Sequence, residues 1–330
     1  MKLATFLDGG VPKVGAVTDN GQMLDLMGAA STAGIAESER IAFGSMLDLI
    51  EAGDDALALA RDLLRDAKSH TLRPYSAKSL LAPLPLPQQL RDCLAFEQHL
   101  SQALDQHARV VASEAADPDR AYQDLMESNA FAIPPVWYQQ PIYYKGNRFS
   151  VIGPEEDIIW PSYSNRLDYE LEIAAIIGRT GKNIARDRAH EHIFGYTIYN
   201  DVSARDAQFK ELPGRLGPAK AKDFDTGNVL GPWIVTADEI DPYDLTMTAT
   251  VNGEEWSRGH SGAMYHRFDR ILEHISAEET LHAGEVIGSG TVGNGCGAEL
   301  NRWLQPGDVI EFDVSGIGTL RNRVVKPSGA

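Results

Sequence analysis

Two glutamates interrupt an otherwise apolar run in the middle of this chain. Glu170 and Glu172 flank Leu171 at the start of segment 169–177, and every other residue of that segment is tyrosine, leucine, isoleucine or alanine. Residues two apart in a β-strand share one face and lie roughly 6.6 Å apart along the backbone, so both carboxylates point the same way. A strand that is apolar on both faces is typical of the interior of a sheet, and we therefore expect the two charges to be buried.

Buried like charges need compensation. They repel one another and lose hydration, so one of them should take up a proton unless a counter-charge lies nearby. Asp201 ends a second apolar run, residues 194–200, and adds a third carboxylate. A divalent cation would compensate this charge, and oxygen ligands without thiolates favour Mg²⁺ or Ca²⁺ over zinc. The other interpretation is an edge strand with a solvated acidic face, and the glutamate pair alone leaves both open.

The composition limits the partners and the location of the protein. The chain has 330 residues, enough for a large core and more than one domain, and a net charge of −17 from 47 acidic and 30 basic residues. Such a charge argues against nucleic acid and anionic membrane as partners. Two cysteines, Cys93 and Cys296, do not make a disulfide framework, which favours a reducing cytoplasm. The N-terminus breaks before an apolar signal segment forms, and no stretch approaches the roughly 20 apolar residues of a membrane span.

A proline-rich segment divides the chain. Residues 1–30 predict short strands joined by turns, and residues 37–68 predict helices with leucines at helical spacing. Segment 80–87 alternates leucine and proline, which excludes a regular helix or a central strand. We therefore expect a small N-terminal β-rich domain with helices over residues 1–82 and a second, larger domain over residues 83–330.

The second part of the chain is rich in β-strand patterns. Residues 99–130 are polar and helix-like, and they indicate an insertion or a helical lid over a site. The fold class expected is a strand-rich α+β protein with few helices in its C-terminal part, rather than an alternating βαβ fold. Strands are expected at residues 141–144, 170–177, 194–200, 233–236, 245–251, 285–289 and 309–314.

Several familiar motifs fit the chain poorly. Residues 288–293 match a dinucleotide fingerprint, but glycine-rich residues 294–297 follow in place of a helix, so a Rossmann site is disfavoured. A loop that brings backbone N–H groups and Thr291 to a ligand fits better. The sequence contains no His-Glu-x-x-His zinc motif and no Gly-x-Ser-x-Gly elbow. We read His190 and His192 as surface residues, and both cysteines as buried or incidental thiols.

Taken together, the polar segments resemble the fumarylacetoacetate hydrolase family over most of residues 90–325. The resemblance implies a mixed β-roll or β-sandwich in the C-terminal domain, preceded by the small variable N-terminal domain of longer family members. The family is commonly dimeric, so a homodimer is expected. The matching segments, in order, are residues 91–99, 141–146, 167–172, 200–208, 222–226, 283–291 and 316–322.

The resemblance also implies roles for individual residues. His99 matches the general base and Glu299 the carboxylate that orients it, while Lys222 and Gln208 complete the implied catalytic set. Thr226 matches a position that supports the metal. The implied metal ligands are Asp92, Glu170, Glu172 and Asp201, and the implied substrate contacts are Arg205, Tyr144, Thr291 and Gln208.

The implied reaction is metal-dependent hydrolysis of a C–C bond in a β-diketo acid, such as an acylpyruvate, as in the catabolism of aromatic compounds. Water activated by His99 and Glu299 would attack the distal carbonyl, and Mg²⁺, with Ca²⁺ or Mn²⁺ as alternatives, would stabilise the departing enolate. A decarboxylase, isomerase or hydratase of a related 2-oxo acid is the alternative, and a non-catalytic binding protein a further one.

Two positions depart from the longer family members. Leu94 and Leu212 stand where those members carry tyrosines on the substrate side of the site. These changes leave the metal chemistry in place and argue against fumarylacetoacetate itself as the substrate.

Overall fold

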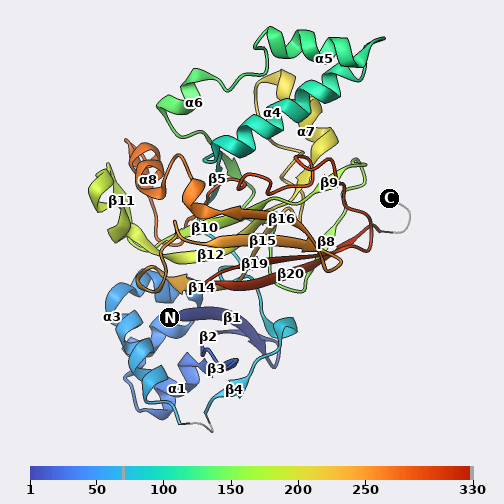
Figure 1. Cartoon of the computed structure of the whole chain (residues 1–330). Helices are drawn as coiled ribbons and strands as arrows, with labels where there is room; N and C mark the ends of the chain where they lie inside the picture. Colours follow the sequence, from blue (N-terminus) through green and yellow to red (C-terminus); the bar gives the residue numbers. More distant parts are fainter. Residues whose placement is uncertain (69–70, 328–330) are drawn as a thin grey trace.

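A computed structural model describes residues 1–68 and 71–327 (Figure 1). The N-terminal part begins with a meander of short strands, as its turn residues predict, and continues into helices. Its strands are β1 (Lys2–Asp8), β2 (Val11–Val17), β3 (Gln22–Asp25) and β4 (Arg73–Pro74). Its helices are α1 (Leu26–Thr32), α2 (Glu37–Arg40) and α3 (Met46–Arg65).

From residue 75 to residue 327 the chain is mainly β-structure, with five α-helices among these described residues. The longer strands are β5 (Leu90–Cys93), β6 (Tyr143–Gly146), β10 (Leu171–Ile177), β12 (Ile193–Asp201), β14 (Asn228–Thr236), β15 (Thr246–Val251), β16 (Glu254–His260), β18 (Val286–Gly288), β19 (Val309–Val314) and β20 (Gly318–Val325). The short ones are β7 (Val151–Ile152), β8 (Asp157–Ile159), β9 (Leu167–Asp168), β11 (Gly181–Lys182), β13 (Ser203–Ala204) and β17 (Thr280–Leu281). The helices are α4 (Glu97–Ala112), α5 (Pro118–Glu127), α6 (Pro135–Gln139), α7 (Arg205–Glu211) and α8 (Phe268–Ser276).

One large sheet runs through the molecule. Its main strand order is β4-β3-β2-β1-β14-β12-β10-β18-β5-β6, and a second sheet has the order β16-β15-β19-β20-β8. β1 pairs with β14, so the N-terminal strands extend the large sheet. The division of the chain at residues 82 and 83 stays a prediction. The predicted strand-rich α+β class is confirmed.

Strand β10 lies in the interior of the large sheet, between β12 and β18, and is buried along its whole length. Leu171 and Ile173 face a core shared with the second sheet, where Phe312 also packs. Ala174 and Ile176 face a separate core formed with helix α3 and the N-terminal strands. Covering both faces explains why this strand is apolar on both sides, as its sequence predicted.

Several elements of the fold were not predicted from the sequence. Helices α7 and α8 were not predicted, although Ile271, Leu272 and Ile275 of α8 are buried at helical spacing. Strand β20 was not predicted either, although its residues alternate between buried and exposed and the same period of two is present in its sequence. β5 was missed because Arg91 and Asp92 fill half of its four positions with charges. The predicted strands at 170–177 and 233–236 begin instead at Leu171 and Asn228.

In Figure 1, α4 and α5 lie together at one end of the molecule, whereas α1 and α3 lie at the other end. Helix α4 begins directly after β5 and carries His99 in its first turn. Residues 99–130, predicted to be helix-like, are largely α4 and α5. Their service as a lid stays a prediction.

Candidate metal centre and catalytic pair

Four buried carboxylates converge at one edge of the large sheet. Asp92, Glu170, Glu172 and Asp201 each offer an oxygen, and these oxygens all lie within 4.8 Å of one another. Glu172 faces Tyr199 across the β10–β12 ladder, so Glu170 reaches the end of β12, where Asp201 lies. Asp92 arrives from β5 on the other side of β18. The structure thus brings together all four residues predicted as metal ligands.

A glycine makes room for this cluster. Gly288 lies on β18 between β10 and β5, opposite Ala174 on one side and Asp92 on the other. A Cβ atom at this position would lie 2.3 Å from Oδ1 of Asp92 and 2.8 Å from the ring of Tyr199. Only a residue without a side chain allows the Asp92 carboxylate to lie this close to the sheet.

Two buried cations neutralise part of the charge. The ammonium of Lys222 donates to Oε2 of Glu170 and to Oδ2 of Asp201, both at 2.6 Å. Arg205 donates from Nε to Asp168 at 2.8 Å and places Nη2 2.8 Å from Oε1 of Glu170. Although burial opposes ionisation, these cations hold the pKa of Glu170 below its ordinary value.

The remaining carboxylates are poorly compensated. Burial and then the charge of Asp201 raise the pKa of Asp92 well above its ordinary value, and burial and then Asp92 do the same for Glu172. Burial also raises the pKa of Asp201, whose Oδ1 has no hydrogen-bond partner although it is buried. An unpartnered carboxylate oxygen among surplus negative charge fits a divalent cation bound through oxygen.

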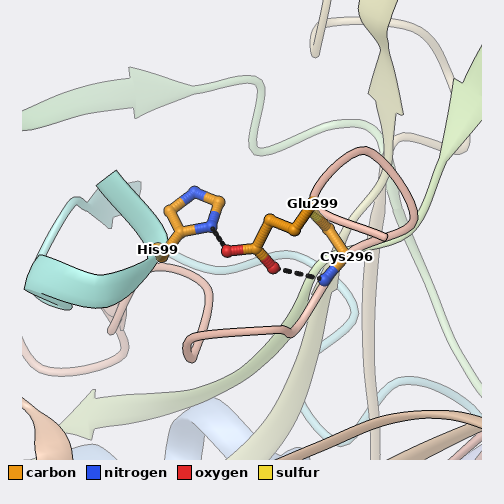
Figure 2. Close-up of side chains that lie close together, drawn as sticks. All are labelled: His99, Cys296 and Glu299. Carbon is orange, nitrogen blue, oxygen red and sulfur yellow. Dashed lines mark hydrogen bonds and ion pairs between the residues drawn. The ribbon is translucent and has the colours of Figure 1, made fainter. Parts of the chain in front are cut away.

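A histidine and a glutamate form a second polar group next to this cluster. Nδ1 of His99 lies 2.9 Å from Oε1 of Glu299, and the backbone N–H of Cys296 donates to Oε2 of Glu299 at 3.0 Å (Figure 2). The side chain of Glu299 is 0% exposed. A carboxylate can only accept a hydrogen bond, so Nδ1 of His99 carries the ring proton and donates it to Glu299. Nε2 is then left unprotonated and can act as a base.

Cys296 lies close enough to His99 and Glu299 to suggest a metal site of its own. Both oxygens of Glu299 are already engaged, however, and burial raises the pKa of the Cys296 thiol well above its ordinary value. A protonated thiol is a poor ligand, so a catalytic pair explains this arrangement better than a metal site. Both cysteines are buried and free, and His190 is exposed, as predicted.

A cavity of about 350 Å³ opens onto both groups. Helices α4 and α7, strand β6 and the glycine-rich loop after β18 contribute to its wall. It is lined by six of the polar residues predicted from the sequence, which are His99, Tyr144, Arg205, Gln208, Lys222 and Thr291, and by Asp92 and Glu170 of the carboxylate cluster.

Several of these side chains are held in place by the cluster itself. Tyr144 donates its hydroxyl to Oδ2 of Asp201 at 2.6 Å, and Thr291 donates to Oε1 of Glu172 at 3.4 Å. The amide oxygen of Gln208 accepts from Arg205 at 3.0 Å, which leaves the amide NH₂ available to a ligand.

Thr226 is the exception among the predicted residues. It is not part of the cavity wall, and its Oγ1 accepts the backbone N–H of Ile159, in β8, at 2.8 Å. Its position therefore does not support the metal-supporting role that the sequence implied. The chain stays close to the cluster here, since Asn228 pairs with Asp201 across the β12–β14 ladder, but the Thr226 hydroxyl is engaged by β8.

The sequence analysis gave no role to Asp168. This residue is 0% exposed, binds Arg205, and accepts the backbone N–H groups of Gly297 and Ala298 at 2.8 and 3.0 Å. It therefore ties Arg205 to the loop that carries Glu299. In the sequence, the position of Asp168 two residues before Glu170 was a signal that the two carboxylates serve the same site.

Comparison with known proteins identifies the family. A family model described as fumarylacetoacetate (FAA) hydrolase C-terminal matches residues 100–325. The chain is 31% identical over 319 residues to oxaloacetate tautomerase YisK of Bacillus subtilis, covering 94% of this chain and 95% of the relative. It is 29% identical over 285 residues to the human mitochondrial oxaloacetate tautomerase FAHD2A, covering 85% and 80%. The chain therefore belongs to the fumarylacetoacetate hydrolase family.

Solved structures agree with this assignment. A fumarylacetoacetate hydrolase of Exiguobacterium antarcticum matches 99% of this chain and 100% of its own with a TM-score of 0.74 and 27% identity. Maleylpyruvate hydrolase of Sphingobium sp. SYK-6, solved with manganese(II) and pyruvate, has the same fold, with a TM-score of 0.68, 21% identity and coverage of 99% and 100%. Those of the similar proteins that carry an enzyme name are named as hydrolases, isomerases or tautomerases, so the names do not decide which reaction this chain performs.

No helix in the described part of the chain is long and apolar enough to cross a membrane.

Proposed function

We propose that this protein is a metal-dependent hydrolase that cleaves a C–C bond in an acylpyruvate-like β-diketo acid. The observation that carries the proposal is the His99–Glu299 pair, 2.9 Å apart, whose histidine lines the same cavity as the carboxylates Asp92 and Glu170. A base beside a cation site is the combination that hydrolysis of a 2-oxo acid requires.

The four carboxylates fit Mg²⁺ or Mn²⁺, and the bound cation would supply Lewis acidity to the oxygens of a 2-oxo acid. His99 would take a proton from water through Nε2, while Glu299 holds the ring and stabilises its positive charge. The water oxygen would attack the distal carbonyl. The C–C bond would then break, leaving its electron pair on the pyruvate fragment, which takes up the proton carried by His99.

Negative charge develops on the distal oxygen during this attack. Lys222 is already engaged, because its ammonium donates to Glu170, to the Asp201 carboxylate and to the Asp201 carbonyl at 3.2 Å. We therefore assign charge balance to Lys222. The amide NH₂ of Gln208 is the better candidate for stabilising the oxygen.

Keto–enol tautomerisation of a 2-oxo diacid is the second candidate. It is favoured by the resemblance to oxaloacetate tautomerase YisK, which extends over 94% of this chain. In this reaction His99 would move a proton between carbon and oxygen of the substrate, and no water would be consumed.

Product analysis distinguishes the two reactions. Acylpyruvates and the enol form of oxaloacetate would each be followed by ultraviolet absorbance with Mg²⁺ or Mn²⁺, and again after addition of EDTA. EDTA-sensitive formation of two smaller acids in a 1:1 ratio supports hydrolysis. Faster ketonisation of oxaloacetate with no cleavage of any acylpyruvate would contradict the proposed hydrolysis and support tautomerisation.

A further inference from the structure

The cavity continues away from the carboxylates as an apolar chamber, which we call the distal pocket. It is formed by α4, α7 and the segments that follow β5 and precede β6. The side chains that define it are Leu94, Ala103, Leu104, Ile142, Phe209 and Leu212. All six are only partly buried or exposed, so they present apolar surface to whatever occupies the cavity.

The cationic side chains that line the cavity are paired with carboxylates, at the end opposite the distal pocket. Among the described residues that line it, Lys222 and Arg205 are the two permanent cations. Lys222 is paired with Glu170 and Asp201, and Arg205 with Asp168 and Glu170. A ligand carboxylate reaching into the distal pocket would therefore find no unpaired cation in this wall.

His107 is the ionisable side chain of the distal pocket. Its ring stacks on Phe209 with centroids 5.4 Å apart and meets Phe131 edge-on at 5.2 Å. Burial lowers its pKa below the ordinary value, so the ring is neutral near pH 7. A neutral imidazole offers one donor and one acceptor, which suits an uncharged polar atom or an aromatic edge better than a carboxylate.

We propose that the distal pocket selects 2-oxo acids whose distal half is uncharged and apolar, such as alkyl- or aryl-acylpyruvates, over dicarboxylates such as oxaloacetate and fumarylpyruvate. This inference rests on the proposed function and names its substrate class. Burying a carboxylate without a partner is strongly unfavourable. Each methylene buried against the leucines and Phe209 should instead raise affinity about three- to fourfold.

The first test compares substrates. kcat/KM would be measured with Mg²⁺ for acetylpyruvate, butanoylpyruvate and benzoylpyruvate, and for the dicarboxylate fumarylpyruvate. The neutral compounds should be preferred by about tenfold or more over a dicarboxylate of similar length. Turnover of the dicarboxylate at an equal or higher kcat/KM would overturn the inference and leave the proposed metal-dependent chemistry intact.

Equilibrium binding separates this inference from the proposed function. Calorimetric titration of the Mg²⁺-loaded protein with the same compounds measures selection without turnover. If nothing is cleaved but the neutral acylpyruvates bind more tightly than the dicarboxylate, the hydrolase proposal fails and the specificity stands. Equal affinities for both classes would overturn the specificity.

A matched pair of variants tests the pocket itself. Leu212 is 50% exposed, so Leu212→Arg should fold and should place a cation beside the distal pocket. The ratio of dicarboxylate to neutral kcat/KM should rise about tenfold or more. Leu216 is 90% exposed and outside the cavity wall, so Leu216→Arg should leave that ratio unchanged. An equal rise in both variants would trace the change to the overall charge and overturn the role of the pocket.

Discussion

Glu170 and Cys296 form an isolated antiparallel backbone bridge, although they lie far apart in the sequence. Glu170 belongs to the carboxylate cluster, and the N–H of Cys296 donates to Glu299, the partner of His99. The bridge thus fastens the loop that orients the base to the segment that carries the candidate metal ligands.

Removing the proposed base should strongly lower turnover and leave metal binding unchanged. His99→Ala should lower kcat by about 10²–10⁴-fold, the usual contribution of a general base. Calorimetric titration with Mg²⁺ should give an unchanged affinity, because His99 contacts Glu299 and is not part of the four-carboxylate cluster. The control is His190→Ala, since His190 is exposed and remote from the cavity wall. Unchanged kcat in His99→Ala would rule out its role as the base.

Removing the Glu172 charge should stabilise the metal-free protein and remove the stabilisation that Mg²⁺ provides. The pKa of Glu172 is raised in the folded protein, so its stabilising effect is complete below the ordinary carboxyl pKa and is lost as pH rises through the raised value. At neutral pH Glu172 therefore makes the metal-free protein less stable than a permanently neutral side chain would. Glu172→Gln should raise the Tm of the EDTA-treated protein by on the order of 1–4 °C, and should abolish the increase in Tm caused by Mg²⁺.

Glu114→Gln is the matched control, because Glu114 is exposed and belongs to no metal cluster. It should behave as the unmodified protein in both measurements. A Glu172→Gln protein that still gains stability from Mg²⁺ would exclude Glu172 as a ligand.

Metal affinity should increase with pH. Burial and neighbouring carboxylates raise the pKa values of Asp92 and Glu172, so these groups retain protons above the ordinary carboxyl range when no metal is bound. A cation must displace those protons, and binding should release them to the buffer. Titrations in two buffers of different ionisation enthalpy measure the number released. An affinity that stays constant between about pH 5 and pH 8 would contradict this coupling.

A single added methyl group should disturb the cluster. Gly288→Ala would place a Cβ 2.3 Å from the Asp92 carboxylate, which must then move. Overpacking of this kind costs about 1–3 kcal/mol of stability, and we expect a loss of Mg²⁺ affinity of about tenfold or more. Gly214→Ala is the control, since no atom lies within 4 Å of the Cβ it would add. Equal Mg²⁺ affinities in the two variants would contradict the crowding at Gly288.

Much of the framework could be predicted from local patterns. The alternation around Glu170 and Glu172 predicted a strand buried on both faces, and β10 is buried throughout. Helix α8 was not predicted, although the helical spacing of its buried residues is present in the sequence. β5 could not be read from its pattern, because its charged residues Arg91 and Asp92 are stabilised by partners from distant segments, Glu285 and Gly290 among them.

By itself, the sequence determined which side chains are candidates for the chemistry. The resemblance to the family pointed to the four carboxylates, His99 and Glu299. The period of two, a local property of a chain, placed Glu170 and Glu172 on one face of a strand. Only the tertiary structure decided what each does. It directed Lys222 and Arg205 to the carboxylates, turned Thr226 toward β8, and left the far end of the cavity apolar. The physical reason is that ion pairs and hydrogen bonds depend on distances of a few ångströms between segments remote in sequence, which no local pattern encodes.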